Sequence, residues 1–318
     1  MSADVSRKII LGSRGSELAR AQTAMVAAAL RRVWPTLEVN VQIITTRGDE
    51  QSAQPSEVGD PRAGRKGLFT GEIERVLAAG EIDIAVHSAK DLPSDATPGL
   101  DVSGALPRAA VDDVLIKKVP WGLASMGSGA IVATGSVRRQ YQLRWTNPQI
   151  QLADLRGNVP TRLRKLAAND WDAIVLARAG VERLGYDLSG GSFTFEGAVF
   201  LTEILPLDQF LPAGGQGVIA MQLRSSDEKT KTIVNAVNDA DTLSCLQAER
   251  EFLRLLQGDC DSPVGVLATI ENCEMTLRAQ VFARPDEPPQ TGKVHSSLRT
   301  QAPEKISAAL HAWMYGQE

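Results

Sequence analysis

The sequence predicts an α/β protein with a smaller α+β region at its carboxyl end. Over the first two-thirds, short apolar runs typical of strands alternate with segments in which apolar residues recur every three to four positions, the pattern of layered α/β folds with mostly parallel sheets. Beyond about residue 240 the order changes to one long helix, two successive β-like runs and a last helix. With 318 residues and 43% apolar content, the chain can bury several hydrophobic cores.

Each element is expected where its residue pattern is clearest. In the first part the strands are expected at 9–11, 39–44, 82–86, 114–116, 131–133 and 173–176. The first helix is expected after Ser16, whose hydroxyl can cap it, with further helices near 71–79, 136–145, 160–168 and 178–184. The tail is expected to hold a helix at 241–257, strands at 264–270 and 274–282 and a helix from Pro303. The segment 51–67, rich in Ser, Pro and Gly, is expected to be a mobile loop.

Composition excludes several classes of protein. No stretch approaches the ~20 apolar residues of a membrane span, and the first residues carry no apolar signal region, so we expect a cytoplasmic protein. The cysteines Cys245, Cys260 and Cys273 form no CxxC pair and have no zinc-site spacing to histidine, which indicates thiols and no metal. The net charge of -4 gives no general attraction for nucleic acid.

Basic residues nevertheless concentrate in one segment, 134–165, where Asp154 is the only acid. They are Arg138, Arg139, Arg144, Arg156, Arg162, Arg164 and Lys165. Two of these clusters, and the segment 13–16, fall where a strand should turn into a helix. The unpaired N–H groups of a helix N-terminus bind anions, and arginine adds bidentate recognition of carboxylates. We therefore expect local anion sites, although any one cluster could equally be a solvated surface.

A second signal follows the strand expected at 82–86, in the segment HSAKDLP. Ser88, Lys90 and Asp91 lie there within four positions, at a strand end where open α/β sheets form their ligand sites. A carboxylate at this place can hold a substrate N–H and stabilise a passing cation. The plainer interpretation of Asp91 is a turn residue, and His87 is expected to be structural.

The third signal is Cys260, in the turn-rich segment GDCDSP. Cys245 and Cys273 fall within a helical and a strand pattern, so they are expected to be ordinary buried cysteines. A thiol on a turn is accessible for covalent attachment. The neighbouring Asp259 and Asp261 favour its protonated form, which suits a permanent linkage better than repeated thiolate chemistry.

Together these motifs resemble the porphobilinogen deaminase family, also called hydroxymethylbilane synthase. The similar segments are SRGSELARAQ (13–22), TRGD (46–49), KGLFTGEIE (66–74), DIAVHSAKDLP (83–93), TGSVRRQ (134–140), LRGNV (155–159) and GQG (215–217). The resemblance implies a transferase of porphyrin and heme biosynthesis that adds four porphobilinogen molecules head to tail to a dipyrromethane cofactor, loses ammonia at each addition and releases a linear tetrapyrrole. It also implies a monomer with no metal, nucleic-acid or membrane partner.

The resemblance implies a fold of three domains as well. Two would be periplasmic-binding-protein-like (type II) α/β domains, one formed by 1–110 with 207–236 and the other by 111–206. The third, 237–318, would be the small α+β domain that carries the cofactor cysteine. The segment 187–203 departs from the family pattern as an insertion, and Pro160 replaces a glycine, which a first helical turn tolerates.

Site residues follow from the same resemblance. The catalytic residues would be Asp91, Lys90 and Arg14. The cofactor would be joined to Cys260 by a thioether and held by Ser88, Lys90, Asp91, Thr134, Ser136, Arg138 and Arg139. Substrate would be bound by Arg14, Ser16, Gln22, Arg156, Gly157, Arg162, Arg183 and Gln216.

Two other classes of protein remain open at this point. A solute-binding or ligand-sensing protein for a polycarboxylate would also need convergent arginines, but it would need neither Asp91 nor an accessible cysteine. A nucleic-acid binder could use the basic segment, yet only Tyr141 and Trp145 supply aromatic rings within it.

Overall fold

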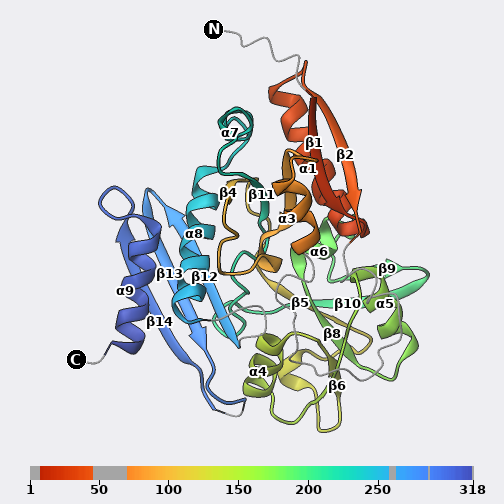
Figure 1. Ribbon diagram of the computed structural model, residues 1–318. Coiled ribbons are helices and arrows are strands. Elements are labelled where there is room, and N and C mark those ends of the chain that lie inside the picture. The colour runs from red at the N-terminus through yellow and green to blue at the C-terminus, as the bar shows by residue number, and fades with distance from the viewer. Residues whose placement is uncertain (1–7, 46–69, 258–262, 286, 317–318) are drawn as a thin grey trace. The chain divides into compact units, whose positions relative to one another are not determined.

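The computed structural model describes residues 8–45, 70–257, 263–285 and 287–316 (Figure 1). The chain divides into two compact units, one formed by residues 1–108 and 218–244 and the other by 109–217 and 245–318. Among the helices that the structure describes, none has the length and apolar character needed to cross a bilayer. The loop expected at 51–67 and the predicted cofactor cysteine, Cys260, lie outside the described residues.

The first unit is built on a five-stranded sheet with the order β2-β1-β3-β11-β4. Its strands are β1 (Lys8–Arg14), β2 (Glu38–Ile44), β3 (Ile84–Ser88), β4 (Leu100–Ala105) and β11 (Ile219–Arg224). Its helices are α1 (Glu17–Val33), α3 (Gly71–Ala78) and α7 (Glu228–Asn235), with a short 3₁₀ turn η1 (Ala89–Asp91) after β3. Strands β1, β2 and β3 are parallel, whereas β11 runs antiparallel to both of its neighbours.

Helix α1 shows how sequence fixes one layer of this unit. Ser16 caps it as predicted, since its hydroxyl accepts the backbone N–H of Ala19 at 3.3 Å. The buried face of the helix, with Val26 and Leu30, joins Leu11 of β1 in one core. Because the three parallel strands have their carboxyl ends at the same edge, the residues that follow β1 and β3 are brought together there.

The second unit contains a six-stranded sheet with the order β7-β6-β8-β5-β10-β9. Its strands are β5 (Asp113–Lys117), β6 (Ile131–Ala133), β7 (Gln151–Ala153), β8 (Ala173–Ala177), β9 (Ser192–Phe195) and β10 (Ala198–Ile204). Its helices are α4 (Val137–Thr146), α5 (Val159–Ala168) and α6 (Arg178–Glu182), with a 3₁₀ turn η2 (Leu123–Ser125). Strands β6, β7 and β8 are parallel, while β5, β10 and β9 continue the sheet in antiparallel fashion.

Both sheets share one arrangement. In each sheet, the second, first and third parallel strands of the unit lie side by side in that order. The next strand, β11 or β5, is antiparallel, and it is the first strand that the chain forms after it has passed from the other unit. This is the topology of the predicted type II periplasmic-binding-protein domains, so the fold class is confirmed. The expectation of mostly parallel sheets is wrong in detail, because the crossing strands and the β9–β10 hairpin make both sheets mixed.

The carboxyl-terminal part is the predicted small α+β structure. Strands β12 (Val264–Glu271), β13 (Glu274–Val281) and β14 (Gln290–Ser297) form an antiparallel meander, packed against α8 (Ala240–Leu255) and α9 (Pro303–Tyr315). Cys245 is buried in this core, as expected. Cys273 is not: it is exposed in the turn between β12 and β13 with φ of 66°, so the expectation of a buried strand cysteine is wrong.

The segment 187–203, expected to be an insertion, contributes to the sheet and the core of the second unit. It forms the β9–β10 hairpin, whose two-residue turn, Glu196 and Gly197, has positive φ at both positions. Phe193 and Phe200 from this hairpin are buried in the core beside Leu163 of α5. This segment therefore extends the sheet and covers part of the second unit's core.

Candidate active site

The first unit places a set of predicted site residues at the carboxyl edge of its sheet. In the register of β1 and β3, Leu11 lies opposite Ile84, which sets Arg14 level with the end of β3. One pocket at this edge includes five of the predicted residues, together with Thr70 and His87. The five are Arg14, Ser16, Gln22, Ser88 and Asp91.

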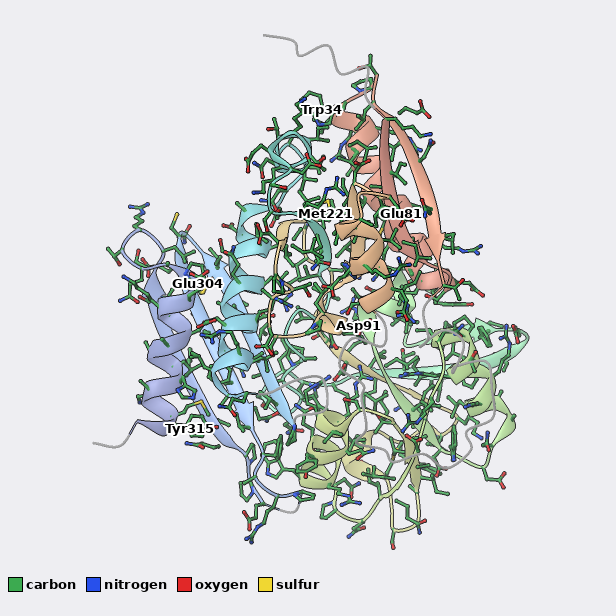
Figure 2. All side chains as sticks on the ribbon, viewed as in Figure 1. Trp34, Glu81, Asp91, Met221, Glu304 and Tyr315 are labelled. Atoms are coloured by element: carbon green, nitrogen blue, oxygen red, sulfur yellow. The ribbon has the colours of Figure 1, made fainter. Side chains whose placement is uncertain are left out.

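Asp91 and Ser88 differ in how they are held. The Ser88 hydroxyl lies 2.9 Å from Nε2 and 3.0 Å from Oε1 of the buried Gln22, so β3 and α1 fix its position. Asp91 is half-buried in η1, and within the residues that the structure describes its carboxylate makes no hydrogen bond or ion pair. Asp91 and Trp34 lie at opposite ends of this unit (Figure 2), which shows how far Asp91 lies toward the sheet edge. Asp91 is thus available to a ligand in the pocket.

His87 is structural, as expected. It is buried, and its Nε2 lies 3.0 Å from Oε1 of Gln222 on β11. The same amide donates from Nε2 to Glu74 of α3 at 2.8 Å. This chain of side chains links three elements beneath the pocket and supports its floor.

The second unit holds a buried charge cluster around Asp113, the first residue of β5. Arg138 Nη1 lies 2.9 Å from Oδ2 and Arg139 Nη2 lies 2.7 Å from Oδ1 of this carboxylate, which is 0% exposed. Burial by itself raises the pKa of Asp113, but the two guanidinium groups outweigh it and hold the pKa well below its ordinary range. The predicted anion-binding arginines therefore already share one carboxylate of their own chain.

The cluster nevertheless keeps an excess of positive charge. Two arginines face one carboxylate, and the Nε atoms of both guanidinium groups are buried with no hydrogen-bond partner in the described structure. Gln216, 1% exposed, donates to the same Asp113 Oδ1 at 2.9 Å. Burial also lowers the pKa of Arg138. A further anion would therefore stabilise this cluster.

Arg183 extends the cluster. It follows α6, and its Nη2 donates to the carbonyl of Gly217, next to Gln216, at 2.7 Å. Within the described residues it forms no ion pair, its Nε has no hydrogen-bond partner, and burial lowers its pKa to about 10. A half-buried cation without an acid nearby is a strong anion site, because a ligand carboxylate would compensate its lost hydration.

The N-terminus of α4 offers further hydrogen-bond donors in the second unit. Ser136 is the N-cap of α4 but its side chain makes no capping hydrogen bond, and Gly135 approaches the Leu155 carbonyl so closely that a Cβ would lie 2.5 Å from its oxygen. The first turn of α4 therefore has backbone N–H groups that its cap side chain does not engage. Thr134 is buried and accepts the Ser136 N–H at 3.3 Å.

The remaining predicted arginines lie around α5, which Asn158 caps and in whose first turn Pro160 fits, as predicted. Arg162 Nε donates to the Gly157 carbonyl at 2.7 Å. Arg156 is exposed and paired with Asp154 at 2.9 Å.

Comparison with known proteins decides the family. Residues 9–232 match the family model of porphobilinogen deaminase, dipyromethane cofactor binding domain, and residues 243–315 match that of its C-terminal domain. The chain belongs to the porphobilinogen deaminase family. It is 44% identical to the porphobilinogen deaminase of Roseiflexus sp. over 281 residues, 88% of both chains, and 37% identical to that of Chlorobium luteolum over 313 residues, 96% of this chain and 95% of the relative.

A solved structure gives a weaker likeness. The periplasmic VFT2 domain of Bordetella pertussis BvgS aligns with 72% of this chain and 86% of its own, at 15% identity and a TM-score of 0.43. At that level the likeness adds nothing to what the sheet order already gives. Membership of the family makes the protein a transferase of tetrapyrrole biosynthesis that acts on porphobilinogen and uses a dipyrromethane cofactor.

The residues present fit such a cofactor. Dipyrromethane carries acidic side chains and pyrrole N–H groups. Each unit by itself has partners for such groups. The second unit has buried cations in excess of acids, with Nε atoms on Arg138, Arg139 and Arg183 that have no partner in the described structure. The first unit has the Asp91 carboxylate as an acceptor. Among the described residues no group of His, Cys, Asp and Glu could hold a metal ion.

Sequence reasoning missed Asp113 and Thr70. Asp113 begins the run DVLIK, and an acid directly before the apolar residues 114–116 of a buried strand is a signal of this kind, since a buried carboxylate needs a cationic partner. Thr70 lies in the matched KGLFTGEIE motif and lines the pocket of Asp91, with a buried hydroxyl that has no partner in the described structure.

Proposed function

We propose that the chain adds four porphobilinogen molecules, one after another, to the dipyrromethane cofactor and then releases the linear tetrapyrrole hydroxymethylbilane by hydrolysis. Each addition forms one carbon–carbon bond and expels one ammonia, and water supplies the hydroxyl group of the product. The observation that carries the proposal is the Asp91 carboxylate at the sheet edge, without a partner in the described structure, in one pocket with Arg14 and Ser88. The family membership favours this enzyme over a solute-binding protein.

Asp91 would act at the reacting ring. Its carboxylate accepts a pyrrole N–H and stabilises the cation that forms on porphobilinogen when ammonia leaves. Arg14, the last residue of β1, and Ser16, the N-cap of α1, would bind a carboxylate of this ring, and Gln22 would hold Ser88 in place. Lys90, beside Asp91 on η1, would bind an acidic group of the cofactor or substrate.

The cofactor, when bound, supplies the pyrrole carbon that attacks. Ser136, Thr134 and the arginine pair Arg138 and Arg139 would orient its acidic groups, through the turn before α4 and the unpartnered Nε atoms. Arg183 would bind a carboxylate of the incoming or growing chain, with Gln216 fixing the position of Asp113. Arg156, Arg162 and the left-handed Gly157 would serve later additions.

Cys260 would carry the cofactor through a thioether. Of the two cysteines that the structure describes, Cys245 is 5% exposed in a hydrophobic core, and Cys273 lies in a turn beside acidic residues rather than beside the cluster. We further propose a cytoplasmic monomer with the three-domain division 1–110 with 207–236, 111–206 and 237–318. Size-exclusion chromatography with light scattering tests the monomer.

The test of function is a comparison of two variants at one position. Asp91→Asn keeps size and one acceptor oxygen but removes the charge, so the rate of hydroxymethylbilane formation should fall by roughly 10²–10³. Asp91→Glu keeps the charge and should retain more activity. Circular dichroism should show both variants folded. Equal activity of the two would reduce Asp91 to a turn residue and overturn the mechanism.

A further inference from the structure

The second unit has another pocket, which none of the predicted site residues lines. It lies where the face of β13 and β14 meets the segment after β10 and the end of α9, with a volume of about 410 Å³. Sites for small molecules have volumes of ~300–1,000 Å³. Its polar lining includes Asp208, Arg278, Thr291 and Lys293, and Trp313 stands at its side.

Two cations face each other in this pocket. Arg278 on β13 lies directly opposite Lys293 on β14 in the antiparallel register. Residues in this relation have Cβ atoms about 4.5–5.5 Å apart, and like charges so placed are destabilising. Arg278 donates to the Leu207 carbonyl at 3.1 Å, but in the described part of the chain neither cation forms an ion pair. Such a pair favours a ligand with two negative groups.

The other walls carry complementary features. Asp208 is exposed and forms no ion pair within the described residues, so it can accept a positive group. Trp313 on α9 is 65% exposed, which is unusual for an indole and leaves a flat ring surface for a planar ligand. Helix α9 packs closely against β14 here, because a Cβ on Gly292 would lie 2.7 Å from Met314 and 2.8 Å from Leu310.

We propose that this pocket is a second binding site for porphobilinogen, separate from the catalytic pocket. The substrate of the family carries two carboxylates, one aminomethyl group that is an ammonium at neutral pH, and a planar pyrrole ring. Its carboxylates would pair with Arg278 and Lys293, its ammonium with Asp208, and its ring would lie against Trp313. The formal charges also match, since the ligand has one net negative charge and these side chains have one net positive charge.

The pocket is connected by hydrogen bonds to the Asp113 cluster. Gln280 lines it and accepts a hydrogen bond from Gln142 of α4 at 2.6 Å. Gln142 also accepts from Arg138, at 2.8 Å, and the Leu211 carbonyl, in the pocket wall, accepts from Arg138 at 2.9 Å. The second site therefore lies within two hydrogen bonds of a residue proposed to orient the cofactor.

Calorimetry with an unreactive ligand tests the site. The probe is the aminoethyl homologue of porphobilinogen, which keeps both carboxylates and the ammonium but cannot expel its amine, and the protein is the full cofactor-loaded chain. Lys293→Gln should abolish one binding event or weaken it at least about tenfold. Lys293 is exposed, so the fold should be unchanged by circular dichroism. The matched control Lys305→Gln, an exposed lysine of α9 outside the pocket, should bind like the wild type.

Tryptophan fluorescence tests whether the pyrrole ring of the ligand lies against Trp313. The probe should change the tryptophan emission of the wild type, and Trp313→Phe should remove that change while the calorimetric event persists. The same stoichiometry and affinity in Lys293→Gln as in the wild type would overturn the proposal. So would equal binding of succinate or inorganic phosphate at this site, because it would then recognise anions and not a pyrrole. The proposal rests on the proposed function, because the ligand is the substrate of that function. Calorimetry measures binding without turnover, so a negative result here can be told apart from a negative result in the activity test of Asp91.

Discussion

Replacing Asp113 with Asn tests whether the arginine pair depends on its internal carboxylate. The change keeps the shape of the side chain but leaves Arg138 and Arg139, 4% and 5% exposed, without a negative partner. The new amide would also point its NH₂ group at a guanidinium. Breaking a buried ion pair by removing one partner costs about 3–5 kcal/mol, because the remaining charge stays buried. We expect a loss of that size in the free energy of unfolding.

The neighbouring residue supplies the control. Asp112 is partly exposed and its Oδ2 lies 3.7 Å from Nη1 of Arg178, which also bonds Glu182. An ion pair of this kind contributes about 0–1 kcal/mol, so Asp112→Asn should be nearly silent. Urea unfolding followed by circular dichroism measures both variants. Equal midpoints for Asp112→Asn and Asp113→Asn would refute the importance of the cluster.

The pH dependence of stability is a second measurement of the ion pairs that Asp113 forms. Burial raises the pKa of Asp113, but the two arginines lower this pKa by a larger amount. The pKa in the folded state therefore lies below the unfolded value of about 3.9. A depressed carboxyl pKa contributes stability that is fully present above the unfolded pKa and is lost as pH falls through the folded pKa. The gap in stability between the wild type and Asp113→Asn should therefore be constant above about pH 5 and shrink in stronger acid. A gap that does not depend on pH would contradict the ion pair.

Three further outcomes follow from single positions. The intact mass of the purified wild type should exceed the sequence mass by one dipyrromethane unit, and Cys260→Ser, but not Cys245→Ser, should lack the increment; an unmodified mass of active wild type would refute the attachment. Arg183→Leu should raise the KM for porphobilinogen about tenfold or more while the fold is kept, because a charge-assisted hydrogen bond is worth ~1.5–3 kcal/mol; an unchanged KM would show that its excess charge binds no substrate. Gly217→Ala should destabilise the fold, since φ is 84° there and a Cβ would lie 2.5 Å from the Ala109 carbonyl oxygen, whereas Gly190→Ala, in open space, should not; thermal unfolding compares the two.

Local pattern predicted most of the elements. Helix α1 begins directly after Ser16 and α8 spans Ala240–Leu255, close to the expected 241–257, because capping and a 3.6-residue period are local properties. Strands such as β7 and β11 were missed for opposite reasons. β7 has only three residues and begins with the polar Gln151, so it lacks the fully apolar run that identified the equally short β6. β11 is buried almost throughout, and such a run has no alternation that distinguishes it from a buried helix.

The site was predictable where its residues are close in sequence. Ser88 ends β3 and Asp91 follows three residues later, and the sheet edge brings them to Arg14 as expected. Asp113 could not be assigned in this way, because its partners come from α4, 25 and 26 residues further along the chain, and pairings of that range are set by topology rather than by local pattern.

This long-range pairing changes the meaning of the arginine concentration. The sequence predicts arginines that bind ligand carboxylates, yet guanidinium groups buried without a negative partner would destabilise the folded protein. Asp113 compensates part of that cost and fixes both arginines by short contacts, while their Nε atoms and the excess charge remain for a ligand. A cluster held in place before binding has little side-chain freedom left to lose, so more of the electrostatic attraction is available for orienting an anionic group. The internal carboxylate can thus strengthen ligand binding even though it has the same sign of charge as the ligand.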